Sequence, residues 1–233
     1  MVTPQAGWHF PALCLKYRTN VLFMEQSHTI RRICMHHGSD PFASAQLPLP
    51  AGDPALLEAL MQPRVALFWG AHTPTRALLT MLTALAVRGQ TLRVFDGGNR
   101  FDGYFVARLA RRMCKHPYAA LERIRLSRAF TCFQLAERIE KTPTGPEPIF
   151  VLDLLTTFYD QNVPLRDSER LLEITISHLK RLATVSPVIV GAREPRELVK
   201  ERWAFLDQLQ TAADIAWLLR APEAGLERQP RLL

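Results

Sequence analysis

The sequence predicts an α/β domain in which a mostly parallel sheet is covered by helices on both faces. From residue 55 onward, short apolar runs alternate with longer segments of helical period, a pattern typical of parallel sheets. The runs are continuously apolar, as expected of strands buried on both faces. Residues 1–54 show no sustained period and end in the turn-rich LPLPAGDP. We therefore expect residues 1–54 to be a short N-terminal arm or linker, partly disordered, and 55–233 to be the core domain.

The elements of the core follow from the positions of apolar residues and helix breakers. A short helix is expected at 55–62, and the run VALFW (65–69), bounded by Pro63 and Gly70, predicts the first buried strand. The next segment, 75–89, has leucines at helical spacing and ends at Gly89. The remaining strands are expected at 91–96, 124–129, 149–155, 187–192 and 214–220. The remaining helices are expected at 103–116, 131–141, 168–183 and 197–210.

The charge of the chain favours a partner that carries phosphates. Its net charge is +7 and its pI is near 9.6, and an excess of arginine suits nucleic acid. A basic protein without such a partner is the alternative. No apolar run is long enough to span a bilayer and no signal peptide is evident, so we expect a cytoplasmic protein without a membrane partner. The four cysteines (Cys14, Cys34, Cys114, Cys132) form no paired zinc-ligand spacing, which predicts free thiols and no metal site.

In parallel sheets, ligands bind at the carboxyl ends of the strands, so the loops there decide the function. The loop after the first strand, GAHTPTRA (70–77), stands where a phosphate-binding loop, G-x-x-x-x-G-K-[ST], would stand. Only Gly70 fits that pattern. Thr75 replaces the second glycine, Arg76 the lysine and Ala77 the magnesium-binding hydroxyl. The strand 149–155 contains FVLD, and Asp153 is placed like the carboxylate that holds magnesium in such proteins.

Taken in order, these segments resemble the core of the RecA/RadA recombinase family. The resemblance runs from about Val65 to Arg220 and lies in five segments. They are VALFWG, LRVFDGGNRFDGYFVARLARR, RIRLSRAFTCFQLAERI, VLDLLTTFYDQNVPLRDSERLLEITISHLKRLA and SPVIVGAR. The resemblance implies a RecA-like core and a nucleotide site that retains Gly70, Thr75, Arg76 and Asp153.

This sequence departs from the family pattern at the residues that would carry out ATP hydrolysis. The resemblance places the catalytic glutamate at Gly98 and the glutamine that senses the γ-phosphate at Arg193. A glycine cannot activate water, so we expect no catalytic residue and a phosphate-binding loop that has decayed. Because arginine can still pair with phosphate, ATP with magnesium remains a weak candidate cofactor. Asp153 is expected either to end a buried strand or to retain metal binding.

The resemblance also implies DNA-binding loops, which coincide with basic residues. Arg166 and Arg170 flank the first such loop, with Tyr159 and Gln161 nearby, a combination that suits single-stranded nucleic acid. The second loop falls at a segment whose cations share a helix face at spacings of three and four. They are Arg193, Arg196 and Lys200, with Arg202 adding charge nearby. A solvated basic face is the alternative interpretation of both groups.

Three functions remain open. The first is a RecA/RadA-like accessory protein of DNA recombination or repair that does not hydrolyse ATP. It would bind DNA, preferably single-stranded, or a recombinase-like or polymerase partner, or it would self-associate. The second is a weak ATP-binding, DNA-dependent ATPase in which Arg76 acts in place of the lysine. The third is a protein-binding inhibitor, similar to the bacterial cell-division inhibitor that has a RecA-like core and no nucleotide site.

Overall fold

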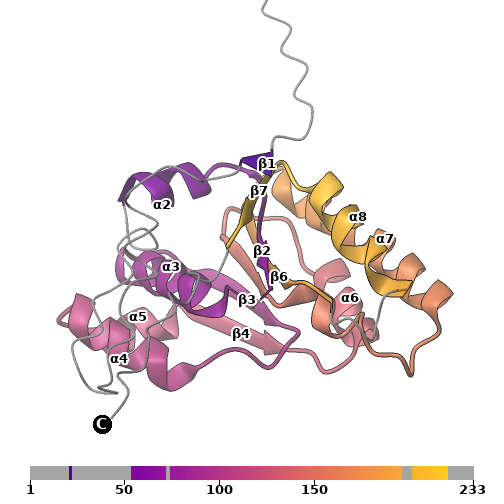
Figure 1. Ribbon diagram of the computed structural model, residues 1–233. Coiled ribbons are helices and arrows are strands. Elements are labelled where there is room, and N and C mark those ends of the chain that lie inside the picture. Colours follow the sequence, from indigo (N-terminus) through magenta and orange to yellow (C-terminus); the bar gives the residue numbers. More distant parts are fainter. Residues whose placement is uncertain (1–20, 23–53, 72–73, 196–200, 220–233) are drawn as a thin grey trace, which may run out of the picture.

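The described residues form an α/β domain around a single parallel sheet (Figure 1). A computed structural model describes residues 21–22, 54–71, 74–195 and 201–219. The sheet has the order β1-β7-β2-β6-β5-β3-β4, and every pair of neighbouring strands is parallel. The strands are β1 (Val21–Leu22), β2 (Arg64–Gly70), β3 (Leu92–Asp96), β4 (Ile124–Arg128), β5 (Ile149–Leu152), β6 (Pro187–Arg193) and β7 (Ile215–Leu218). The expected α/β fold is confirmed, and the arrangement is consistent with a RecA-like core.

Helices cover both faces of the sheet, as Figure 1 shows. On one side lie α2 (Pro54–Leu60), α3 (Thr75–Val87), α4 (Gly103–Met113) and α5 (Pro117–Glu122). On the other side lie α6 (Cys132–Glu140), α7 (Leu165–Ala183) and α8 (Ala204–Ala212). A short 3₁₀ turn, η2 (Leu154–Thr156), follows β5. Among the described residues, no helix is long and apolar enough to cross a membrane.

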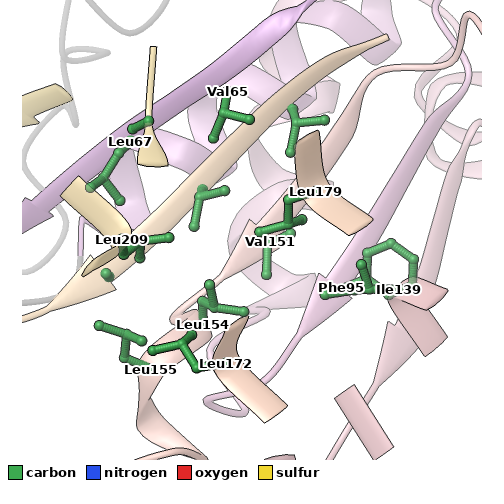
Figure 2. Packing of buried hydrophobic residues seen from close by; sticks show 14 of the residues in the cluster. Val65, Leu67, Phe95, Ile139, Val151, Leu154, Leu155, Leu172, Leu179 and Leu209 are labelled. Atoms are coloured by element: carbon green, nitrogen blue, oxygen red, sulfur yellow. The ribbon is translucent and has the colours of Figure 1, made fainter. Parts of the chain in front are cut away.

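Successive residues of each strand point to opposite faces of the sheet and form two separate hydrophobic layers. In β2, Val65 and Leu67 pack toward α6, α7 and α8, whereas Ala66 and Phe68 pack toward α2, α3 and α4. Figure 2 shows the first layer, where Val65, Leu67 and Val151 of the strands lie among leucines of the helices. Each large apolar side chain buried in this way contributes about 1.5–3 kcal/mol to folding. Because both faces of the sheet are buried in these layers, the sequences of the strands are continuous apolar runs.

Side-chain caps fix where two of the helices begin. Asp102 precedes α4, and its carboxylate accepts a hydrogen bond from the backbone N–H of Phe105. Thr131 precedes α6, and its hydroxyl accepts one from the backbone N–H of Gln134. Such caps satisfy donors that have no partner within the helix, and each contributes about 1 kcal/mol. The starts of both helices therefore follow from the sequence.

Some elements differ from the expectation. The short helix α5 lies between the helix expected at 103–116 and the strand expected at 124–129, where no element was expected, and Pro117 at its first turn is a favourable helix start. The two-residue strand β1 joins β7 within the segment expected to be an arm. The helix expected at 197–210 begins as α8 at Ala204. Most of the arm, residues 1–20 and 23–53, lies outside the described residues.

Candidate functional site at the carboxyl edge of the sheet

Four strands bring the expected site residues to one edge of the sheet. Gly70 at the end of β2 is the register partner of Arg193 at the end of β6. On the other side of β6 lies β5, which leads directly into Asp153, and next to β5 lies β3, which ends at Asp96. The topology therefore places Asp153 between the ends of β6 and β3. This edge is where the ligand of a parallel sheet is expected.

Asp153 is fully buried and is held by arginines from both neighbouring strands. Its Oδ2 atom lies 3.3 Å from Nε of Arg100, in the loop after β3, and 3.4 Å from Nε of Arg193. Arg193 is further fixed by Thr156, whose hydroxyl oxygen accepts hydrogen bonds from Nε at 3.1 Å and from Nη2 at 2.9 Å. We call Arg100, Asp153, Thr156 and Arg193 the Asp153 cluster. In this cluster two guanidinium groups balance one buried carboxylate.

Asp153 also has an unusual backbone conformation, with φ of 53° in the left-handed region. This conformation disfavours most side chains, and aspartate and asparagine tolerate it best. It turns the chain from β5 into η2 and directs the carboxylate toward the end of β3. The second carboxylate oxygen, Oδ1, is buried and has no hydrogen-bond partner within the part of the chain that the structure describes. Asp153 thus carries both local strain and an uncompensated polar atom.

Gly98 faces Asp153 so closely that no other residue fits there without displacement. A Cβ atom on Gly98 would lie 2.5 Å from Oδ2, 2.7 Å from Cβ and 2.9 Å from Cγ of Asp153. The φ of Gly98 lies outside the left-handed region, so the obstacle is lack of space alone. The resemblance placed a catalytic glutamate at this position. In this chain the side chain of Asp153 fills the space that the glutamate would need.

Asp96 performs a structural role beside the cluster. Its Oδ1 accepts a hydrogen bond from the backbone N–H of Arg100 at 2.8 Å, and its Oδ2 accepts one from Phe101 at 2.9 Å. Nε of Arg128 at the end of β4 lies 3.7 Å from the same Oδ2. Asp96 is fully buried, and it fixes the loop that carries Gly98 and Arg100. The loop geometry that directs Arg100 toward Asp153 therefore originates in Asp96.

The loop after β2 retains few contacts suited to phosphate. Gly70 is buried, and its carbonyl accepts a hydrogen bond from the backbone N–H of Glu194 at 2.9 Å. Thr75 begins α3, and Pro74 before it provides no side-chain cap and has no N–H to donate. The guanidinium of Arg76 lies over the ring of Phe105, 5.6 Å from its centroid. His72 and Thr73 lie outside the described residues.

These residues do not fit a complex of ATP with magnesium. The resemblance places the magnesium-binding hydroxyl at Ala77, which has none, and Asp153 has two guanidinium groups at its Oδ2. A divalent cation at that oxygen would be repelled by both. Among the described residues, no group of three or more His, Cys, Asp or Glu side chains could hold a metal ion.

The residues expected to bind DNA lie in different environments in the structure. Arg166 and Arg170 are exposed on the first turns of α7, and neither has a partner among the described residues. Arg193 points into the Asp153 cluster instead of toward solvent, with 21% of its side chain exposed. Arg196 and Lys200 lie outside the described residues. The structure therefore brings Arg193 to Asp153 and leaves Arg166 and Arg170 on the surface.

The expectation that Arg202 adds to a basic surface is wrong. Arg202 is only 5% exposed. Its guanidinium donates to the carbonyl oxygens of Phe158 and Val163 and to the hydroxyl of Ser168, and it lies over the ring of Phe205. Arg202 therefore ties the loop after η2 to α7. Helical spacing alone could not reveal this role, because it does not show which backbone carbonyls lack partners.

Tyr159, which follows η2, contacts the backbone of Arg193 in the Asp153 cluster. Its hydroxyl donates a hydrogen bond to the carbonyl of Arg193 at 3.1 Å. Burial raises the pKa of Tyr159 well above its usual value, and the negative charge of Asp153 raises it further. The hydroxyl therefore remains a donor throughout the physiological range of pH. Tyr159 was expected near a DNA-binding loop, and the structure places its hydroxyl against the protein backbone.

Sequence reasoning missed Arg100 and Thr156, which complete the Asp153 cluster. Arg100 belongs to the loop VFDGGNRFD (94–102), whose basic residue could have been paired with the buried Asp153 once the two strands were taken as neighbours. Nothing in the sequence indicates the role of Thr156, because that role depends on the turn that the left-handed Asp153 produces. No protein-family model matches the chain, and a search of curated proteins finds no significantly similar sequence.

Proposed function

We propose that this chain is a RecA/RadA-like accessory protein of DNA recombination or repair that binds single-stranded DNA and does not hydrolyse ATP. The observation that carries the proposal is the Asp153 cluster. The carboxylate that would hold magnesium is paired with Arg100 and Arg193, and the position of the water-activating base is Gly98. Hydrolysis requires a held metal and an oriented water together, and this edge of the sheet supports neither.

The DNA part of the proposal rests on charge and on surface residues. The net charge of +7 favours a polyanionic partner. Several cations are exposed without a partner among the described residues and are available to phosphates, Arg111, Lys115, Arg166 and Arg170 among them. Binding without hydrolysis leaves the protein to act by occupying DNA or by assembling with a recombinase-like or polymerase partner. No nucleotide is needed for either action.

Two measurements on the purified chain test this function. ATP turnover is measured with and without single-stranded DNA, and affinity for labelled single-stranded and duplex DNA is measured across a salt series, with and without ATP and magnesium. We expect no turnover above background, preference for the single strand, and affinity that falls steeply with salt but ignores ATP. Turnover stimulated by DNA, or thermal stabilisation by ATP, would instead support the weak ATPase in which Arg76 replaces the lysine.

A second candidate function is self-association through the edge of the sheet at β4. Among the described strands, β4 pairs only with β3, and it is followed by the exposed side chains of Phe130 and Phe133. An open depression of about 680 Å³ lies beside it, between β4 and α6. An extended segment from a second copy of the chain would add to this edge as a further strand. Analytical ultracentrifugation of the wild type and of Phe130→Asp would show a dimer that the substitution dissociates, and a monomeric wild type would refute the idea.

A further inference from the structure

The net charge of the chain comes entirely from a segment that makes up less than one fifth of its length. Residues 88–128 contain ten Lys or Arg and three Asp or Glu, against 29 and 22 in the whole chain, which leaves 19 of each elsewhere. This segment forms β3, α4, α5 and β4, at one end of the sheet (Figure 1). Its cations are Arg88, Arg93, Arg100, Arg108, Arg111, Arg112, Lys115, Arg123, Arg125 and Arg128.

More than half of these cations are engaged within the protein, Arg112 among them. Arg93 and Arg125 share Glu147, at 2.7 and 3.0 Å. Arg100 pairs with Asp153 and Arg128 with Asp96, and Arg123 donates to the carbonyls of Ala86 and Ala119. By contrast, Arg108, Arg111 and Lys115 have no hydrogen-bond or ion-pair partner among the described residues. These three lie on α4 and on the turn just after it.

Two exposed tyrosines lie on α4 and on α5, the helix that follows it. Tyr104 is 73% exposed and Tyr118 is 72% exposed, although neither ring is charged and both are large. Tyr104, Arg108 and Arg111 follow each other at spacings of four and three, so they share one face of α4. Lys115 and Arg111 line the same open depression as Pro117, which starts α5 and directly precedes Tyr118. We call Tyr104, Arg108, Arg111, Lys115 and Tyr118 the α4–α5 surface.

We propose that the α4–α5 surface is the site that binds single-stranded DNA, and that it acts apart from the loops at the carboxyl edge of the sheet. This inference rests on the proposed function. Unpaired cations suit phosphates, and exposed tyrosine rings suit the flat faces of unpaired bases. Duplex DNA fits less well, because its bases are stacked inside the helix and a tyrosine ring cannot reach their faces. The acidic side chains nearby are Asp102, whose carboxylate caps α4, and Glu122 at the end of α5.

The site is tested by comparing two pairs of charge reversals that lower the net charge equally. Arg111→Glu with Lys115→Glu alters the α4–α5 surface, and Arg166→Glu with Arg170→Glu alters the start of α7. Binding of a labelled oligothymidylate is measured by anisotropy across a salt series, and circular dichroism checks that each variant is folded. We expect the first pair to weaken binding at least about tenfold and to reduce the salt slope by about 1.4, since each phosphate contact on a single strand contributes about 0.7. The second pair should change affinity by less than about threefold.

The tyrosines are tested by Tyr104→Leu with Tyr118→Leu, which keeps apolar bulk and charge. We expect about a tenfold loss of affinity for oligothymidylate, and no loss for an abasic oligonucleotide of equal length, because stacking requires a base. If the pair at Arg166 and Arg170 abolishes binding while the pair at Arg111 and Lys115 leaves it intact, the inference is wrong and the proposed function stands. If the wild type binds neither oligonucleotide at low salt, the proposed function itself fails.

Discussion

The Asp153 cluster and the α4–α5 surface are both rich in arginine, yet they use it in opposite ways. Arg100 and Arg193 turn inward to one fully buried carboxylate, whereas Arg111 and Lys115 lie on the surface with no partner among the described residues. A buried charge must be compensated, so the inward arginines contribute to folding. An exposed cation contributes little to folding and remains available to a ligand. The comparison shows that the groups around an arginine, rather than the arginine itself, decide which role it takes.

The largest expected effect on stability belongs to Arg202, the most buried arginine that the structure describes. Arg202→Ala removes donors from the carbonyls of Phe158 and Val163 and from Ser168, which leaves buried acceptors without partners. We expect the free energy of unfolding to fall by about 3 kcal/mol. The exposed control, Arg111→Ala, should change it by less than about 0.5 kcal/mol. Urea unfolding measures both, and similar losses in the two variants would contradict the division into inward and outward arginines.

The next effect comes from the close contact between Gly98 and Asp153. Gly98→Ala places a methyl group 2.5 Å from the Oδ2 atom, so the carboxylate must move away from its arginines. We expect a loss of about 2 kcal/mol from overpacking. Gly145→Ala is the matched control, since a Cβ there meets nothing within 4 Å. Thermal unfolding of the two variants decides the point, and equal melting temperatures would show that Asp153 is not confined as described.

A smaller effect is expected from the arginines of the cluster, because they are partly exposed. Arg193→Ala should cost about 1–2 kcal/mol, and Arg100→Ala less, since 40% of its side chain is exposed against 21% for Arg193. In the Asp153→Asn variant the carboxylate charge is absent. Adding Arg193→Ala to that variant should therefore lower the free energy of unfolding by less than it does in the wild type. A double-mutant cycle in urea measures the coupling. A coupling of zero would mean that the ion pair contributes nothing.

The smallest effect is a dependence on pH that belongs to Tyr159. Burial beside Asp153 raises its pKa in the folded protein above the unfolded value near 10. The stability that this shift contributes is fully present below about pH 10 and is lost as the pH rises further, because only the unfolded chain then releases the proton. Tyr159→Phe has no proton to release, so its stability should fall less steeply above about pH 10. Parallel curves for both proteins would place Tyr159 in a solvated environment.

The fold could be predicted from the sequence because its signals are local. The continuous apolar run of β2 and the caps Asp102 and Thr131 specify strands and helix starts without reference to distant residues. The site could be predicted only in part. Asp153 was found because it ends an apolar strand, but its pairing depends on Arg100 and Arg193, which lie 53 and 40 positions away along the chain. Likewise, Arg202 was expected to add charge to a nearby basic face, and only the packing against α7 shows it to be buried.

The most direct test of the division into inward and outward arginines is the salt dependence of DNA binding. It is measured in two single variants, Arg193→Ala and Arg111→Ala. Each removes one arginine, so any difference reports on where the arginine lies. We expect Arg111→Ala to lower the salt slope for oligothymidylate by about 0.7, the contribution of one phosphate contact, while its stability is kept. Arg193→Ala should keep the wild-type slope and lose stability. A reduced slope in Arg193→Ala, with no change in Arg111→Ala, would place the DNA at the carboxyl edge of the sheet and contradict this account.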